Sequence, residues 1–370
     1  MTVDSISIND AEIIKPTELL AAIEKFFRRF CVMPDHAYFP VAVWALATHS
    51  IEIFDTFGYL ALTSPVKGCG KTRVLEVLNL LCRQPEMCAC VTPASLFRML
   101  REMPTVLIDE MDLLEGSKSE VQDEIRKILN VGYKRGAYVP RCDGPDHKVV
   151  RFPVFSPKAL GAIGSLPRTV MDRSIAIQMQ RKPKEQKLER FLLFRVEPQA
   201  VPIAQAAGRF AREFVEDIRT AYVYIAESSE IDDMPISDRD IETWLALFAV
   251  CAVASPDRLV EIKRCAELMS KSKQAADAND SDRLKLLGDI RNQWPAVQAF
   301  WETASLIDSL LGLEESPWSE PMTKLTPVKL ARLLKPFEIT PSKIRDSATG
   351  KAGVRGYHLE PFQKAWRRYL

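Results

Sequence analysis

Apolar residues follow two kinds of pattern in the first half of the chain. Short continuous apolar runs, which are typical of strands buried on both faces, occupy 57–63, 88–91, 105–109, 158–164 and 174–179. Between these runs the apolar residues recur at helical spacing, most clearly at 72–82 and 121–133. Strands that alternate with helices are typical of a parallel sheet with helical crossovers. The pattern therefore predicts an α/β core.

Helical spacing also dominates on both sides of this core. Residues 16–31 and 35–55 predict a small helical front piece. From 185 to 273 the pattern is helical throughout, with a break at Pro235, and the Lys-, Ala-, Asp- and Ser-rich tract 270–281 predicts a linker or a frayed helix end. We therefore divide the chain into an N-terminal helical segment (1–55), a core (56–184), a helical lid and linker (185–293) and a C-terminal domain (294–370).

Inside the core, a change of pattern predicts a β-hairpin at 137–152. Two strand-like segments, 137–142 and 148–152, flank Asp143-Gly144-Pro145-Asp146, which has strong turn chemistry. His147 and Lys148 lie at or beside its tip, with Arg141 and Arg151 on its arms.

The run Pro65-Val66-Lys67-Gly68-Cys69-Gly70-Lys71-Thr72 joins the first predicted strand to the helix that follows. Strand, glycine-containing loop and helix together are typical of a phosphate-binding loop. Gly68 and Gly70 would let backbone N–H groups close around a β-phosphate, and the dipole of the helix would add to their effect. Lys71 would reach the β and γ oxygens, and Thr72 would hold Mg²⁺. The candidate nucleotide contacts are Pro65, Gly68, Cys69, Gly70, Lys71 and Thr72.

This run departs from the pattern G-x-x-x-x-G-K-[ST] because Pro65 stands where the leading glycine belongs. Alone it could be an ordinary strand-to-helix turn. A second motif favours the phosphate loop, because the predicted strand 105–108 ends in Asp109-Glu110. Asp109 would complete the Mg²⁺ site, and Glu110 would polarise an attacking water. The two motifs together predict binding and hydrolysis of a nucleoside triphosphate, for which we take ATP and Mg²⁺.

The composition limits the class of protein and where it is expected to be found. A chain of 370 residues with 47% apolar and 27% charged residues is typical of a globular protein with two or three domains. It has no run of roughly 18 uncharged apolar residues, and Met1-Thr2-Val3-Asp4 does not begin a signal peptide, so we expect a cytoplasmic protein with no membrane contact. The eight cysteines form no C-x-x-C pair and are expected to be reduced packing residues. A net charge of +1 neither demands nor excludes nucleic acid.

The motifs also resemble a known family. Residues 62–72, 107–110 and 172–175, with the closing segments 353–358 and 366–370, resemble AAA+ ATPases of a family of uncharacterised domains. That family occurs on phages, plasmids and integrated elements, often attached to or encoded beside primases, and in it Ser-Pro replaces the leading glycine of the loop. The resemblance runs from about residue 18 to the end. It implies an AAA+ core and a helicase-like ATPase of mobile-element DNA replication, with a primase as a possible partner.

The resemblance also implies roles for single residues. Arg173 falls where such ATPases place an arginine finger, which stabilises charge on the γ-phosphate bound by a neighbouring subunit. Arg168 is the alternative finger, and a surface ion pair between Arg173 and Asp172 is the alternative reading.

Two further positions match sensors of the γ-phosphate. Ser165 follows the fourth core strand. Arg239, at the start of a lid helix, matches a second sensor arginine. Alternatively, Arg239 forms an ion pair with Asp240.

AAA+ proteins that translocate on DNA tend to carry a hairpin where 137–152 lies, pointing into a central pore formed by several subunits. The resemblance therefore implies that His147 and Lys148 are candidate contacts to nucleic acid. A positive ring of such hairpins could follow a phosphate backbone without reading sequence. The alternative is a solvated hairpin with ordinary surface charge.

The C-terminal segment is more basic than the rest, with eleven Lys and Arg against three Asp and Glu in 321–370. Segments 326–337 and 341–345 predict two short helices, and the glycine-rich segment 349–356 predicts a wing. That order is typical of a winged helix, which binds DNA or, alternatively, docks proteins. The candidate DNA contacts are Lys343 and Arg345 on the recognition helix, with Lys351 and Arg355 on the wing.

The sequence thus favours an ATP-driven DNA helicase or translocase that forms a ring, with a hexamer as the expected size. It would act on single-stranded or forked DNA in mobile-element or phage replication. The alternative is an AAA+ initiator, loader or regulatory switch that does not translocate. A metabolic kinase fits less well, because Glu110 beside Asp109, the helical lid and Arg173 all suit self-assembling hydrolases better.

Overall fold

The computed structural model describes residues 15–88, 91–111, 120–143, 148–164, 166–183, 185–295, 298–313, 318, 325–344 and 354–370. The chain separates into two compact units, Met1–Lys273 and Gln274–Leu370. The boundary falls within the long helix α11 (Leu259–Gln293).

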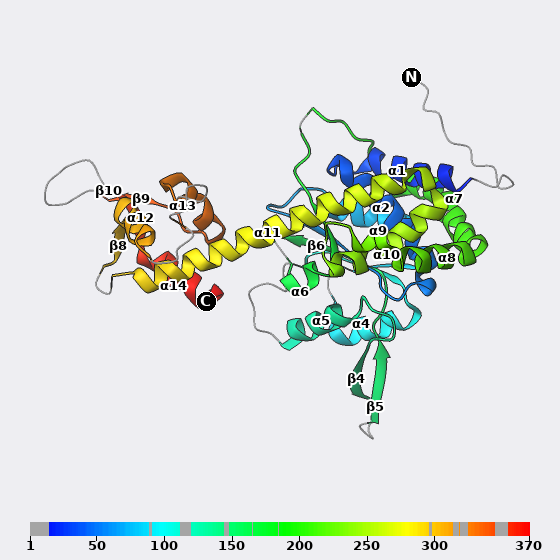
Figure 1. The fold of residues 1–370 in the computed structure, drawn as a ribbon, viewed down its shortest axis with the longest axis horizontal. Helices are drawn as coiled ribbons and strands as arrows, with labels where there is room; N and C mark the ends of the chain where they lie inside the picture. Colours follow the sequence, from blue (N-terminus) through cyan, green and yellow to red (C-terminus); the bar gives the residue numbers. More distant parts are fainter. Residues whose placement is uncertain are drawn as a thin grey trace. The chain divides into compact units, whose positions relative to one another are not determined.

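A five-stranded parallel sheet forms the centre of the first unit (Figure 1). Its strands are β1 (Tyr59–Ser64), β2 (Pro85–Cys88), β3 (Thr105–Ile108), β6 (Lys158–Ile163) and β7 (Ser174–Gln178). Their order in the sheet is β2-β3-β6-β1-β7. The predicted mixed α/β core with a parallel sheet is confirmed.

Helices cover both faces of this sheet because alternate residues of each strand point to opposite sides. Leu60 and Leu62 of β1 belong to one apolar core, and Tyr59 and Ala61 belong to the other. The first core is completed by α1 (Pro16–Phe30), α2 (Asp35–Ala47), α3 (Lys71–Leu81), α7 (Leu193–Glu213) and α10 (Asp238–Ala254). The second is completed by α4 (Pro93–Met99), α5 (Glu120–Val131) and α6 (Arg168–Met171).

The prediction for the second strand is wrong in position. The sequence predicts a strand at 88–91, whereas β2 occupies Pro85–Cys88 and pairs with β3. β2 is an edge strand, so Glu86 can point to solvent and a proline can stand at the first position without losing a ladder hydrogen bond. The polar residues that hid the strand in the sequence are therefore compatible with its place at the edge.

The predicted hairpin is confirmed. β4 (Tyr138–Asp143) and β5 (Lys148–Pro153) pair antiparallel, from Tyr138 opposite Pro153 to Asp143 opposite Lys148. The hairpin projects from the part of the unit that holds α4 and α5 (Figure 1). At its base Phe152 packs on Phe97 of α4, with ring centroids 5.6 Å apart.

The helical region after the sheet begins later and ends later than the sequence predicts. Its first helix starts at Leu193, and α8 (Val215–Ala226), α9 (Ser229–Asp232), α10 and α11 follow. Pro235 lies between α9 and α10, as predicted. The expected linker at 270–281 is instead part of α11. This tract holds no Gly or Pro, and its Lys and Ala residues are good helix formers.

The second unit combines helices with a three-stranded antiparallel sheet of order β8-β10-β9. Its elements after α11 are β8 (Phe300–Glu302), α12 (Thr303–Leu311), α13 (Pro327–Leu334), the 3₁₀ turn η5 (Lys335–Phe337), β9 (Ser342–Ile344), β10 (Val354–His358) and α14 (Leu359–Tyr369). The predicted helix at 341–345 is wrong, because Ser342–Ile344 pairs with β10 as a strand. A segment this short carries no helical period, so tertiary pairing decides its conformation.

Candidate functional site

The 65–72 loop leaves the carboxyl end of β1 and enters the first turn of α3. Gly68 and Gly70 have φ angles of +77° and +84°, in the left-handed region that favours glycine. Gly70 also serves as the N-cap of α3, so the backbone N–H groups of the first helical turn face the loop. A loop of this kind at a helix N-terminus is a site for anions.

Lys71 is only 8% exposed, and its ammonium group donates to the Ser64 hydroxyl at 2.5 Å. Ser64 Oγ in turn donates to the carbonyl of Val66, 2.8 Å away. Ser64 therefore holds Lys71 against the loop, a role that the sequence motif does not reveal. Pro65 begins the loop as an exposed residue and has no N–H to offer a phosphate.

The acidic pair lies next to this loop. The Thr72 hydroxyl donates to Asp109 Oδ2 at 2.5 Å, which brings together two residues that lie 37 positions apart in the sequence. The other carboxylate oxygen, Asp109 Oδ1, accepts the backbone N–H of Glu110 at 3.0 Å. One hydroxyl and one carboxylate thus converge at the carboxyl edge of the sheet, as the sequence predicts.

Gly161 of β6 makes room for the Asp109 carboxylate. A Cβ at this position would lie 2.8 Å from Asp109 Oδ1 and 3.4 Å from a methyl group of Leu75. Gly161 was not among the predicted site residues. The available signal was a glycine inside a predicted strand, which often marks a close approach of another group.

Glu110 combines exposure with an unusual backbone. Its φ angle is +58°, which costs a residue with a side chain about 1–3 kcal/mol. Such conformations occur most often at functional sites, where the surrounding structure holds them in place. The buried Met111, 4% exposed, follows directly and fixes the chain beyond the turn.

Residues that follow β7 bond to β1 and to the 65–72 segment, and a bond within the segment adds to them. Met179 donates its backbone N–H to the Thr63 carbonyl at 2.7 Å, and Arg181 Nε donates to the Lys67 carbonyl at 3.3 Å. Cys69 is 4% exposed and donates its thiol to Val66 O at 3.3 Å, so it acts as a packing residue. Arg181 is a further residue that the motif does not reveal.

These residues fit a Mg²⁺–nucleotide. The two glycines and the helix N-terminus suit phosphate oxygens, and Lys71 supplies a positive charge beside them. Oxygen ligands from Thr72 and Asp109 are the kind that Mg²⁺ prefers. Around Gly68 there is open space where a Cβ would stand, so this part of the loop can accept a ligand.

The two predicted arginines are not part of this cluster. The Arg173 carbonyl accepts the backbone N–H of Tyr59 at 3.0 Å, at the amino end of β1. The 65–72 loop follows the opposite, carboxyl end of β1, about 17 Å away at 3.3–3.4 Å per residue. Arg239 contacts Tyr133, whose carbonyl binds Phe57 N–H just before β1, so it also lies at the amino edge. Arg239 therefore does not lie beside the 65–72 loop, and in place of the alternative ion pair with Asp240 it lies 3.7 Å from Glu242.

The other site residues predicted in the first unit lie on α6, in the hairpin or outside the described residues. Arg168 is exposed on α6, and Ser165 and His147 lie outside the described residues. Lys148 is in β5, opposite Asp143. In the hairpin, Arg141 pairs with Glu124 at 2.8 Å and covers the Phe97 ring, whereas the exposed Arg151 covers the Tyr138 ring at 4.7 Å.

In the second unit, Lys343 and Arg355 are exposed and face each other across the β9–β10 pair. Lys343 is on a strand, so its expected place on a recognition helix is wrong. Arg345 and Lys351 lie outside the described residues. The exposed side of α13 and η5 carries Arg332 and Lys335, which were not predicted as contacts.

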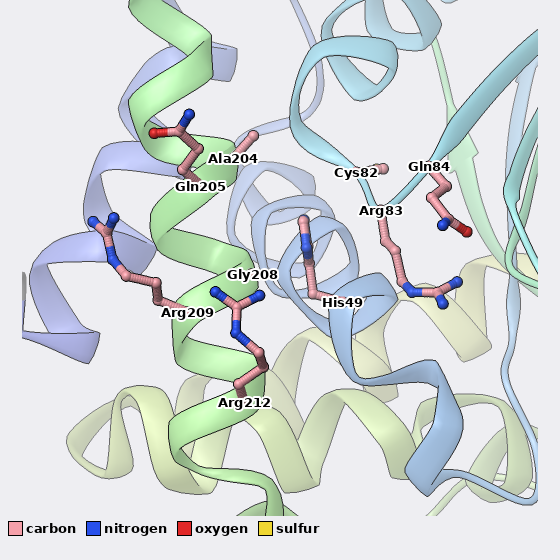
Figure 2. A pocket seen from close by; sticks show the side chains of 9 residues that line it. All are labelled: His49, Cys82, Arg83, Gln84, Ala204, Gln205, Gly208, Arg209 and Arg212. Carbon is pink, nitrogen blue, oxygen red and sulfur yellow. The ribbon is translucent and has the colours of Figure 1, made fainter.

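A separate cavity of about 390 Å³ lies between the carboxyl end of α3 and α7 (Figure 2). Its lining includes Arg83, Arg212 and His49. His49 Nε2 lies 2.9 Å from the Leu81 carbonyl, and burial lowers the pKa of this histidine. The 11-residue helix α3 separates the cavity from the 65–72 loop at its other end, so the cavity does not belong to the nucleotide site.

Among the described residues, no helix is both long and apolar enough to cross a membrane.

Residues 178–369 match the family described as "Protein of unknown function (DUF3631)". This match covers more than half of the chain. The chain belongs to the DUF3631 family. The matched segment begins at the last residue of β7, so the 65–72 loop and the acidic pair precede it, whereas Arg239 lies inside it.

Two other proteins are similar over parts of the chain. An "Uncharacterized 28.9 kDa protein in xis 5′region" of Saccharopolyspora erythraea is 31% identical over 140 residues, which are 37% of this DUF3631 protein. The chain spans about half the length of that curated relative (51%). The crystal structure of a full-length MCM homolog from Methanopyrus kandleri aligns with a TM-score of 0.44 and 12% identity, over 72% of this chain and 62% of that one. A score this low does not establish a common fold.

Proposed function

We propose that this DUF3631 protein is an ATP-hydrolysing AAA+ motor, and specifically a ring-forming DNA helicase or translocase of mobile-element or phage DNA replication. The observation that carries the ATPase part is the 2.5 Å contact between Thr72 and Asp109, with Lys71 held beside it. Strand β6 lies between the loop-bearing strand β1 and the acidic strand β3. This order is in keeping with the AAA+ core that the sequence resemblance implies.

Each residue of the site has a definite task in this proposal. The backbone N–H groups of the loop and Lys71 would bind the phosphates and offset their charge, and Thr72 and Asp109 would hold Mg²⁺. Mg²⁺, when bound, supplies positive charge that the phosphate oxygens need during transfer. Glu110 would orient a water molecule and accept its proton at the carboxylate. Gly161 would leave the space that the Asp109 carboxylate occupies.

The position of Arg173 supports assembly with other copies of the chain. This residue lies about 17 Å from its own phosphate loop, so its guanidinium could act only on a nucleotide bound to another copy. A contact between the amino edge of one copy and the carboxyl edge of the next is head-to-tail. Head-to-tail contacts close into a ring when the rotation allows. A hexamer is the size that we propose.

Two features support DNA as the substrate. The hairpin 137–152 projects from the first unit (Figure 1). On it the exposed Arg151 lies over the Tyr138 ring. The second unit orders its elements as helix, strand, two helices and a two-stranded wing, with the central strand β10 between β8 and β9. This arrangement supports a winged helix in which α13 is the recognition helix. A primase remains a possible partner on the sequence resemblance.

The first experiment is to measure ATP turnover with and without single-stranded and duplex DNA over a range of protein concentrations. Strong stimulation by DNA, with a rate per subunit that rises with concentration, is the expected result. Lys71→Ala should abolish turnover and serves as the control for contaminating ATPase. Turnover that depends on concentration but not on DNA would favour the non-translocating switch, and absence of turnover would overturn the proposal.

A further inference from the structure

Two arginines from distant parts of the chain flank one buried tyrosine at the amino edge of the sheet. The guanidinium carbon of Arg173 lies 5.3 Å from the Tyr133 ring centroid, and that of Arg239 lies 5.4 Å from the same centroid. Tyr133 is 2% exposed, and its carbonyl accepts the backbone N–H of Phe57 at 2.9 Å. The ring is therefore a fixed platform for both guanidinium groups.

Polar contacts orient Arg239 further. Its guanidinium donates to the Tyr133 hydroxyl, which donates to Glu242 Oε2 at 3.3 Å. The other Glu242 oxygen accepts from Lys134 at 3.0 Å. Because Lys134 already pairs with this carboxylate, and Arg239 lies 3.7 Å from it, the cluster keeps a surplus of positive charge. The Arg239 side chain is 41% exposed, so this charge is accessible.

The Arg173 side chain has fewer polar contacts than that of Arg239 in the described part of the chain. One of its guanidinium nitrogens donates to the Thr169 carbonyl. Its Nε atom is buried and has no hydrogen-bond partner among the described residues. Because Nε is buried, an incoming anion would meet the terminal nitrogens of the guanidinium group rather than Nε. A phosphate oxygen is a suitable acceptor, because the planar guanidinium matches phosphate in a bidentate manner.

The position of this cluster excludes the chain's own nucleotide as the anion. Both arginines lie at the amino edge of the sheet, and the 65–72 loop lies at the carboxyl edge, about 17 Å away. The anion must therefore come from another molecule. A head-to-tail neighbour would bring its carboxyl edge, with the triphosphate bound there, against this amino edge.

We propose that Arg173, Arg239 and Tyr133 form one surface that receives the phosphates of a nucleotide bound to a second copy of the chain. In this arrangement Arg239 acts in trans beside Arg173, and Tyr133 is the positioning residue that orients both. The inference rests on the proposed ATPase function and deepens it. Arg239, which the resemblance matched to a lid sensor, would then belong to the contact between subunits.

The decisive experiment mixes two inactive variants. Lys71→Ala keeps the arginine surface and lacks a working loop, whereas Arg239→Ala keeps the loop and lacks one arginine. Each alone should have little turnover, and a mixture should exceed the sum of the two, because some loops then face an intact arginine surface. A matched mixture of Lys71→Ala with Arg173→Ala should behave in the same way.

The other outcomes separate this inference from the proposed function. Recovery with Arg173→Ala but not with Arg239→Ala would overturn the trans role of Arg239 and leave the ATPase in place. Wild-type turnover by Arg239→Ala alone would do the same. If Arg239→Ala loses DNA binding in the absence of nucleotide, the surface binds DNA and the inference is wrong. A wild-type protein without ATPase activity would overturn the proposed function and this inference with it.

A second variant tests Tyr133 without removing the ring. Tyr133→Phe deletes the hydroxyl that holds Arg239, so kcat should fall by about tenfold or more while KM for ATP and the unfolding temperature change little. Tyr38→Phe is the matched control, because it removes another buried hydroxyl, which accepts the Met33 N–H at 3.1 Å and donates to the Cys31 carbonyl at 2.9 Å. Equal kcat values in Tyr133→Phe and wild type would overturn the positioning role.

Discussion

Lys273 of α11 and Asp240 of α10 form a buried ion pair, with their side chains 7% and 3% exposed. Asp240 also accepts the Ser237 hydroxyl at 2.8 Å in the first turn of α10. Two helices are thus joined by a charge pair whose carboxylate is satisfied on both sides. The residue next to Asp240 is Arg239, so this pair also fixes the backbone that presents the arginine proposed to act in trans.

Lys273→Met should destabilise the first unit, because it leaves the Asp240 carboxylate buried without its cation. Removing one partner of a buried pair costs about 3–5 kcal/mol. The free energy of unfolding, measured by urea denaturation, should fall by about that amount. The double variant Lys273→Met/Asp240→Leu should recover part of the loss, since no charge then remains buried. A single variant as stable as wild type would show that water reaches the pair.

Gly161→Ala should impair the nucleotide site while the fold remains. The added methyl group would approach Asp109 Oδ1 to 2.8 Å, so the carboxylate must move away from Thr72. We expect turnover to fall by about a hundredfold, comparable to loss of one preorganised electrostatic contact. The measurement is ATP turnover as a function of Mg²⁺ concentration, with the loss greatest at low Mg²⁺.

The control for this change is Gly288→Ala, which adds the same methyl group within α11 where nothing lies within 4 Å. It should leave turnover unchanged and stabilise the helix by up to about 1 kcal/mol. Unchanged turnover in Gly161→Ala at every Mg²⁺ concentration would show that Asp109 does not depend on this space.

The sequence predicts those parts of the site that depend on neighbouring residues. The two glycines with positive φ, Lys71 and Thr72 lie in one loop, and their roles follow from local geometry. The contact between Thr72 and Asp109 could also be predicted from the sequence, because the carboxyl ends of parallel strands lie at one edge of the sheet. Gly161 was not, because its importance depends on β6 lying next to β3, which only the sheet order reveals.

Other features of the structure depend on tertiary contacts in the same way. The resemblance matched Arg239 to a sensor position at the start of a lid helix, whereas its contact with Tyr133 depends on how α10 packs on the end of α5. Segment 342–344 was read as a helix because three residues show no period, and its pairing with β10 decides the outcome. In both cases tertiary contacts override a local pattern.

Lys158 should make stability depend on pH. Burial lowers the pKa of its ammonium group to about 7, although the group donates to the carbonyls of Gly132, Val154 and Ser156 at 3.2, 2.9 and 3.0 Å. Because the folded pKa lies below the ordinary value of 10.5, the unfolded chain binds the proton more tightly. The contribution is therefore fully present above the unfolded pKa and is lost as the pH falls through about 7.

The measurement compares wild type with Lys158→Met, since other titrating groups cancel in the difference. The free energy of unfolding of wild type relative to the variant should rise with pH from about 7 upward, by at most about 1.4 kcal/mol per pH unit. A difference that stays constant between pH 7 and 9 would mean that the three carbonyls keep the amine charged.

Arg332→Glu should weaken DNA binding by the second unit. Arg332 is exposed on α13, the helix that the proposed winged-helix arrangement places against DNA. Loss of one phosphate contact should reduce the slope of log K against log salt by about 0.9 on duplex DNA. Lys364→Glu on α14 is the control, because Lys364 is an exposed cation of the same unit that pairs with Glu360 at 2.8 Å. If both variants reduce the slope equally, the effect reflects the net charge of the unit and α13 has no special place at the DNA.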